Sequence, residues 1–290
     1  MVMSTLLDRA VDITKSIWSD AFIALYAYGS IVRGEADDWS DIDMCLIRRP
    51  CDEHRLAARA WFRTLKDTLG DKIDPTVLPM VALHESAAWH IACTLHCLRD
   101  QSWFLLGRDI RARILAPSDH WLRLDNCQAP LRMLRALCEI PCDQPLSRPM
   151  RAPRCTLDRS VLNGNIAWAV SGAVVCVLRA IVNIQTGIFS NGRRSLSAEL
   201  RSLGERDLMA LCEEALELRG QVPRFAPLTS MPPAVPHLAW SLSALADRLF
   251  DTMTAHGLRD PSYQPLGESI YQDDGTLRAD CQALGILGIR

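Results

Sequence analysis

The residues with the clearest chemical potential in this sequence are two aspartates, Asp41 and Asp43, on either side of a single isoleucine. Side chains alternate along a β-strand, so both carboxylates would point to the same face. They follow a Gly-Ser pair, Gly29-Ser30, and the polar loop of residues 31–40. Mg²⁺ is commonly held by one or two carboxylates together with substrate phosphates. An isolated Asp-x-Asp would indicate no more than a solvated strand end, but this combination indicates a site for Mg²⁺ and a nucleotide.

Two apolar runs must position these residues. The run "AFIALYAY" (21–28) predicts a buried strand that ends at Gly29, and "DIDMCLI" (41–47) predicts a second strand. Gly29 has no Cβ, so the backbone can turn sharply there and bring its amides close to a ligand. Ser30 is a good N-cap for a short helix, whose free N–H groups would favour phosphate. The sequence therefore predicts a phosphate-binding turn just before the two carboxylates.

The stretch "YGSIVRGEADDWSDIDMCLI" (28–47) resembles the signature of the DNA polymerase β-type nucleotidyltransferase superfamily. Its fuller form is similar to that of bacterial antibiotic nucleotidyltransferases, the aminoglycoside adenylyltransferases and their relatives. The Gly-Ser, Arg-Gly and Ser-Asp-x-Asp elements follow one another in the family's order. The resemblance implies an α+β fold, in which a nucleotidyltransferase domain with a small mixed β-sheet flanked by helices precedes an all-α helical-bundle domain.

The family also requires a third carboxylate on a neighbouring strand. After a helix predicted over residues 52–69, Asp74 lies in the apolar run "KIDPTVLP" and is the best candidate, with Asp71 and Glu85 as alternatives. By resemblance, Asp74 completes the metal site and accepts the proton of the attacking hydroxyl. Pro75 departs from the family pattern, because proline cannot donate a hydrogen bond within a sheet and therefore belongs on an edge strand or a bulge.

The resemblance implies transfer of a nucleoside monophosphate, expected to be AMP, from ATP or another nucleoside triphosphate to a hydroxyl of a small molecule such as an aminoglycoside-like antibiotic. Two Mg²⁺ ions would take part, and pyrophosphate would be released. By resemblance, the residues that carry the reaction are the metal-binding Asp41, Asp43 and Asp74 and the triphosphate-binding Gly29, Ser30 and Arg33. A solvated loop arginine is an equal alternative for Arg33. Glu35, Asp37 and Asp38 would form an acidic rim suited to a cationic acceptor, or simply a solvated loop.

Two other functions stay open. The first is an antitoxin-like enzyme that adds AMP to a partner protein; such enzymes are usually minimal catalytic domains, so the additional helical region of this chain argues against it. The second is a relative that binds nucleotide without catalysis, which the intact Ser30, Asp41 and Asp43 make a weaker alternative. The net charge of −2 gives no basic track for nucleic acid, and this disfavours a polymerase or an RNA-tailing enzyme.

Composition places the chain among globular proteins, because 49% of its residues are hydrophobic. Eleven cysteines and the lack of a signal-peptide pattern at the N-terminus predict reduced thiols and a cytoplasmic location. Cys93 and Cys97, with His90 and His96 nearby, allow a zinc site, although small buried helix residues are the simpler interpretation. A homodimer is compatible with the sequence but not required by it.

Prolines concentrate between residues 130 and 153, where one short helix is predicted, so we expect a domain boundary in this region, with domains of 1–125 and 126–290. Before it, residues 84–115 predict two helices separated by a break near Gly107, with Asp109 as a helix cap. After it, the pattern predicts only helices, over residues 157–186, 195–203, 207–218 and 237–256. The apolar run 166–182 is too short for a membrane span and predicts a buried core helix. The segment after Pro261 gives no clear pattern.

Overall fold

The computed structural model of the 290-residue chain describes residues 3–18, 22–36, 40–49, 54–83, 91–140, 153–157, 160–161, 164–189, 192–224 and 226–258. The chain divides into two compact units: the described residues of the first run to Ser118, and those of the second begin at Asp119. The boundary predicted at residues 125/126 falls inside a helix of the second unit. The assignment of functional domains to 1–125 and 126–290 stays a prediction.

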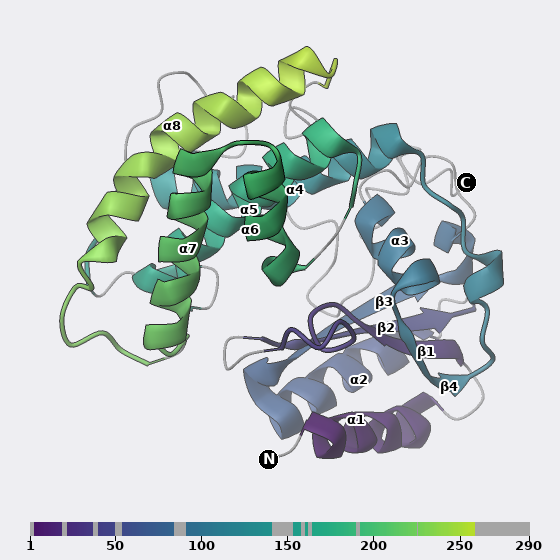
Figure 1. Cartoon of the computed structure of the whole chain (residues 1–290). Helices are drawn as coiled ribbons and strands as arrows, with labels where there is room; N and C mark the ends of the chain where they lie inside the picture. Colours follow the sequence, from purple (N-terminus) through teal and green to yellow (C-terminus); the bar gives the residue numbers. More distant parts are fainter. Residues whose placement is uncertain are drawn as a thin grey trace. The chain divides into compact units, whose positions relative to one another are not determined.

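The first unit is a small mixed sheet with helices, as the sequence predicts (Figure 1). Its elements are α1 (Met3–Trp18), β1 (Phe22–Tyr28), β2 (Ile42–Arg48), α2 (His54–Leu69), β3 (Ile73–Pro79), α3 (Ala92–Asp100) and β4 (Trp103–Gly107). The strand order is β3-β2-β1-β4; β1 runs antiparallel to β2 and β4, whereas β2 and β3 are parallel. Pro75 therefore lies on an edge strand, where its missing N–H is tolerated.

Alternating side chains of the sheet pack into two separate cores. On one face, Leu25 packs with Trp18 of α1 and Trp61 of α2. On the other face, Tyr26 packs with Leu95 of α3. Because both faces are covered, the strands are nearly continuous apolar runs, and a polar side chain at a strand end stands out from them.

The segment before residue 115 differs from the prediction of two helices. Among the described residues 91–115, α3 and a short 3-10 turn, Arg111–Arg113, are helical together with Ile91, and Trp103–Gly107 is the edge strand β4, paired with β1. Its aromatic and aliphatic residues suit a strand, and pairing with β1 fixes this conformation. Gly107 ends the strand with φ +91°, and a Cβ there would lie 2.4 Å from the carbonyl oxygen of Ile23. Residues 84–90 lie outside the described part of the chain.

The second unit is helical, as predicted. Its helices are α4 (Asp119–Cys138), α5 (Ile166–Thr186), α6 (Arg193–Ser202), α7 (Arg206–Gln221) and α8 (Ala234–Ala255). The other four pack against α5, which is apolar on all sides. By length and composition α5 could cross a membrane, but 83% of its most apolar window is buried inside the protein. It is the core helix that the sequence predicts.

Two boundaries in this unit correct the sequence interpretation. The short helix predicted within the proline-rich stretch is the end of α4, a 20-residue helix that contains Pro130. The helix predicted from residue 157 begins only at Ile166, after two short paired strands, Ser160–Val161 and Gly164–Asn165. Asn165 caps α5 by accepting a hydrogen bond from the Trp168 N–H at 2.9 Å. Its side-chain amide also donates to three carbonyls of the segment after α7, a non-local contact that the local pattern does not reveal.

Candidate active site

The Gly-Ser turn follows β1 directly, and a pair of hydrogen bonds closes it. Glu35 N–H donates to the Ser30 carbonyl at 2.9 Å, and Gly34 N–H donates to that of Ile31 at 3.2 Å. With Gly34 at φ +68°, this is the hydrogen-bond pattern that ends many helices with a left-handed glycine. The short helix predicted from Ser30 is thus a single turn. The Ser30 hydroxyl forms no hydrogen bond within the described part of the chain, which leaves it available to a ligand.

The predicted carboxylates lie on one face of the sheet. In the strand register, Asp43 is opposite Tyr28 on one side and opposite Asp74 on the other. Adjacent strands are about 4.8 Å apart, so Asp43 and Asp74 are direct neighbours. Asp41 precedes β2 by one residue, and alternation places it on the same side as Asp43. Ile42, between the two aspartates, is buried on the opposite face.

Gly29 and Asp43 are in close contact. Gly29 has φ +78°, and a Cβ added to it would lie 1.8 Å from Oδ2 and 2.8 Å from Cγ of Asp43. The carboxylate therefore occupies the space that any other residue at position 29 would need. This contact joins the turn predicted to bind phosphate to a carboxylate predicted to bind metal.

The chemistry of this group of residues fits Mg²⁺, which prefers oxygen ligands and carboxylates in particular. Within the described residues, no three His, Cys, Asp or Glu side chains form a group able to hold a metal ion by themselves. An ion bound by Asp41, Asp43 or Asp74 would therefore complete its coordination with phosphate and water oxygens, as Mg²⁺ often does in nucleotide sites. Among the described residues, Cys93, His96 and Cys97 belong to no group of ligands able to hold a zinc ion. His90 lies outside the described residues.

Arg33 and Glu35 form an ion pair across Gly34. Arg33 Nε lies 3.2 Å from Glu35 Oε2, and their side chains are 20% and 10% exposed. Glu35 is therefore not the solvated rim residue that the sequence suggests. Asp37, Asp38 and Glu85, which the sequence also raises, lie outside the described residues, as does the side chain of Asp71.

Comparison with known families identifies the class of domain to which this part of the chain is similar. Residues 7–75 match the model of the nucleotidyltransferase domain, a range that includes the Gly29-Ser30 turn and all three carboxylates. By this match, residues 7–75 are similar to a nucleotidyltransferase domain. The resemblance of residues 28–47 to the polymerase β-type nucleotidyltransferases is thereby confirmed.

A known structure extends the likeness beyond this nucleotidyltransferase domain. The spectinomycin adenyltransferase from Enterococcus faecialis, crystallised with ATP and spectinomycin, matches with a TM-score of 0.58 over 86% of this chain and 100% of that chain. The two sequences are 11% identical, so the likeness concerns the fold. No curated protein matches the sequence.

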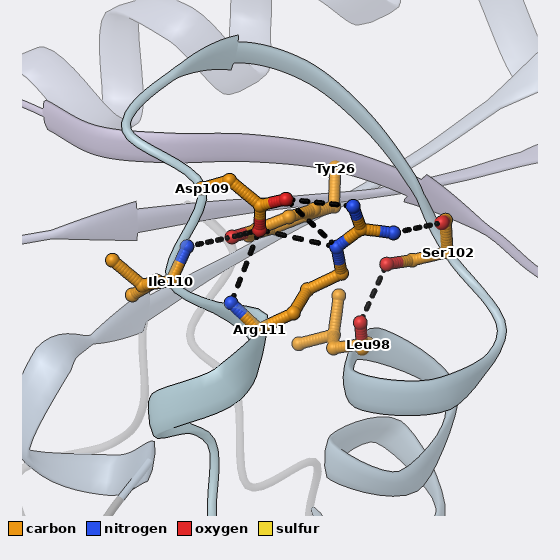
Figure 2. Close-up of polar contacts among 6 residues, drawn as sticks. All are labelled: Tyr26, Leu98, Ser102, Asp109, Ile110 and Arg111. Atoms are coloured by element: carbon orange, nitrogen blue, oxygen red, sulfur yellow. Dashed lines mark hydrogen bonds and ion pairs between the residues drawn. The ribbon is translucent and has the colours of Figure 1, made fainter.

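A polar network in the first unit was not evident from the sequence (Figure 2). The Tyr26 hydroxyl donates to Asp109 Oδ1 at 3.1 Å and accepts from Ile110 N–H at 2.8 Å. Asp109 also accepts from the backbone and guanidinium of Arg111. Burial raises the pKa of Tyr26 to about 12, and the hydrogen bond from Arg111 lowers the pKa of Asp109 to about 2. The network attaches the segment after β4 to β1. Asp109 holds the turn before the 3-10 segment Arg111–Arg113, whose N-cap residue is Ile110, so Asp109 is not the helix cap that the sequence predicts.

This network should make the stability of the domain depend on pH on the acid side. Because the pKa of Asp109 falls from 3.8 to about 2 on folding, its stabilising effect is fully present above the unfolded value and is lost as the pH falls through the folded one. The side chain is 38% exposed, so the effect should stay below about 1 kcal/mol. In urea unfolding, the stability difference between wild type and Asp109→Asn should shrink from about pH 5 to pH 3.

Arg111→Gln should lose the same pH-dependent part of the free energy of unfolding as Asp109→Asn. The reason is that the Arg111 hydrogen bond is the main cause of the shift in the Asp109 pKa. If the difference in unfolding free energy between wild type and Asp109→Asn stays constant over this pH range, the Asp109 carboxylate is not the source of the pH dependence.

Proposed function

We propose that this protein transfers a nucleoside monophosphate, expected to be AMP, from a nucleoside triphosphate to a hydroxyl of a small molecule. The observation that carries the proposal is the contact of the Asp43 carboxylate with the Gly29 backbone, in register with Asp74. These residues lie within the range matched by the nucleotidyltransferase model. The turn that we propose binds phosphate is therefore next to the carboxylates that we propose bind metal.

Each residue has a role in this reaction. Asp41, Asp43 and Asp74 would hold Mg²⁺, which when bound neutralises charge on the triphosphate and lowers the pKa of the acceptor hydroxyl. Asp74, exposed on the edge strand, can accept the hydroxyl proton. The acceptor oxygen then forms a bond to the α-phosphorus, the bond from that phosphorus to the bridging oxygen breaks, and pyrophosphate leaves.

The turn would bind the triphosphate. Gly29 lets the backbone approach the phosphates closely, and the Ser30 hydroxyl, which has no hydrogen-bond partner among the described residues, can donate to a phosphate oxygen. Arg33 belongs to the same turn, since its N–H donates to the Gly29 carbonyl at 3.4 Å, and a guanidinium can bind two phosphate oxygens at once. ATP is the expected co-substrate, in line with the ATP in the crystal structure of the spectinomycin adenyltransferase.

The acceptor we propose is an aminoglycoside-like antibiotic. The proposal is supported by the spectinomycin bound to the structural neighbour and by the helical unit that follows the nucleotidyltransferase domain here. The acceptor chemistry of this chain depends on side chains specific to it, because fold alone does not determine function.

Pyrophosphate release tests this function. The purified chain would be incubated with Mg²⁺ and either ATP or GTP, together with aminoglycosides, lincosamides or nucleosides. Release that depends on both the metal and an acceptor is expected. Labelling of proteins without a small acceptor would favour the protein-modifying alternative, and thermal stabilisation by a nucleotide without turnover would favour a non-catalytic binder.

A further inference from the structure

We infer that Glu35 is a positioning residue for the triphosphate, acting through Arg33; this inference rests on the proposed function. Residues two apart do not face each other in a helix. Here Gly34 between them has φ +68°, and this left-handed residue reverses the chain so that the two side chains meet at 3.2 Å. Glu35 also closes the turn through its own N–H, so its backbone and its side chain both fix the loop.

The pair leaves the phosphate-binding side of the guanidinium free. Glu35 accepts a hydrogen bond from Nε of Arg33, whereas the two terminal nitrogens form no hydrogen bond within the described part of the chain. A guanidinium is planar, so a carboxylate on Nε fixes the plane in which the remaining donors lie. These donors are the ones that can bind two phosphate oxygens at once.

Burial explains why the carboxylate is needed. The Arg33 side chain is only 20% exposed, and a charged group that has lost water requires a partner. Without Glu35 the guanidinium would turn towards solvent and would have to be reordered each time a triphosphate binds. Holding it in place beforehand lowers the entropy lost on binding.

A positioning role for Glu35 and simple electrostatics predict opposite changes in anion affinity when Glu35 is replaced. Glu35→Gln removes a negative charge next to an anion site, so electrostatics alone would tighten anion binding. Positioning predicts weaker binding instead, by about two- to tenfold, the scale of ordering one long side chain. The probe is inorganic tripolyphosphate with Mg²⁺, measured by calorimetry on the full chain, because it does not depend on which base the site prefers.

Arg33→Gln, Glu35→Gln and the double variant form a double-mutant cycle. Arg33→Gln should weaken tripolyphosphate binding by about tenfold or more, as expected for a lost charged hydrogen bond. The double variant should be no weaker than Arg33→Gln alone, because the effect of Glu35 on tripolyphosphate binding is transmitted through Arg33. Asp12→Asn is the matched control; it removes the same charge from an exposed pair with Lys15 in the same unit and should leave the affinity unchanged.

The outcomes separate this inference from the function it rests on. Equal or tighter binding by Glu35→Gln, or additive effects in the double variant, would overturn the positioning role and leave the nucleotidyltransferase proposal standing. If Glu35 only stabilises the loop, Glu35→Gln would lower the melting temperature with no change in affinity, which also overturns it. If wild type binds neither tripolyphosphate nor any nucleoside triphosphate, the proposed function fails, and the inference fails with it.

Discussion

Asp43→Asn is expected to abolish pyrophosphate release, with a decrease of about 100-fold or more, since loss of even an outer-shell partner of a metal ligand costs about 10- to 100-fold in activity. Asparagine has nearly the same shape as aspartate, so it can keep the contact with Gly29. It lacks the negative charge that attracts Mg²⁺, and its amide is a weaker metal ligand. The loss should therefore appear in turnover under saturating Mg²⁺ and nucleotide.

The stability of this variant distinguishes a catalytic loss from misfolding. In wild type, Asp43 is a direct neighbour of Asp74 in the strand register, and like charges at this distance disfavour each other. Removing one of them should leave the free energy of unfolding unchanged or raise it slightly. Wild-type activity in Asp43→Asn would contradict the metal assignment; lost activity together with lost stability would point to a structural role instead.

Gly29→Ala is the second change with a large expected effect. The new Cβ would lie 1.8 Å from Asp43 Oδ2, so either the strand end or the carboxylate must move. The left-handed backbone adds a strain of about 1–2 kcal/mol. We expect activity to fall about as far as in Asp43→Asn, together with a measurable decrease in the free energy of urea unfolding.

Gly70→Ala separates these two effects. Gly70 is in the same unit with φ +66°, and, its chain neighbours apart, a Cβ added to it would meet no atom of the described residues within 4 Å. It should therefore show the backbone strain alone, with a loss of about 1–2 kcal/mol in stability and near-normal turnover. Full activity in Gly29→Ala, or an equal loss of activity in both variants, would show that the Gly29–Asp43 contact is not important for the reaction.

The strand–turn–strand around the site could be predicted because its signals are local. The apolar run before Gly29 and the alternation around Asp41 and Asp43 depend only on neighbouring residues, and both strands lie where this pattern places them. Asp74 could be proposed from the resemblance, but its register with Asp43 depends on how β3 aligns with β2. That alignment is fixed by packing of the whole sheet rather than by the sequence near residue 74.

Other features depend on contacts between distant segments. The strand β4 was missed because its partner β1 is far away in the sequence, and an apolar run of five residues is too short for its periodicity to distinguish a strand from a helix. The start of α5 was missed because Asn165 is held by carbonyls of residues 223–226. The ion pair of Arg33 and Glu35 requires the left-handed Gly34 between them; the Arg-Gly-Glu sequence was its only local signal.

Anomalous diffraction from Mn²⁺ tests the central claim most directly. Crystals of the full chain would be grown with Mn²⁺ in place of Mg²⁺ and a non-hydrolysable analogue of ATP. We expect Mn²⁺ peaks within coordination distance of Asp43 and at least one of Asp41 and Asp74, with the triphosphate on the Gly29-Ser30 turn. A bound nucleotide whose Mn²⁺ ions are held elsewhere, with Asp43 in contact with neither metal nor phosphate, would contradict the account.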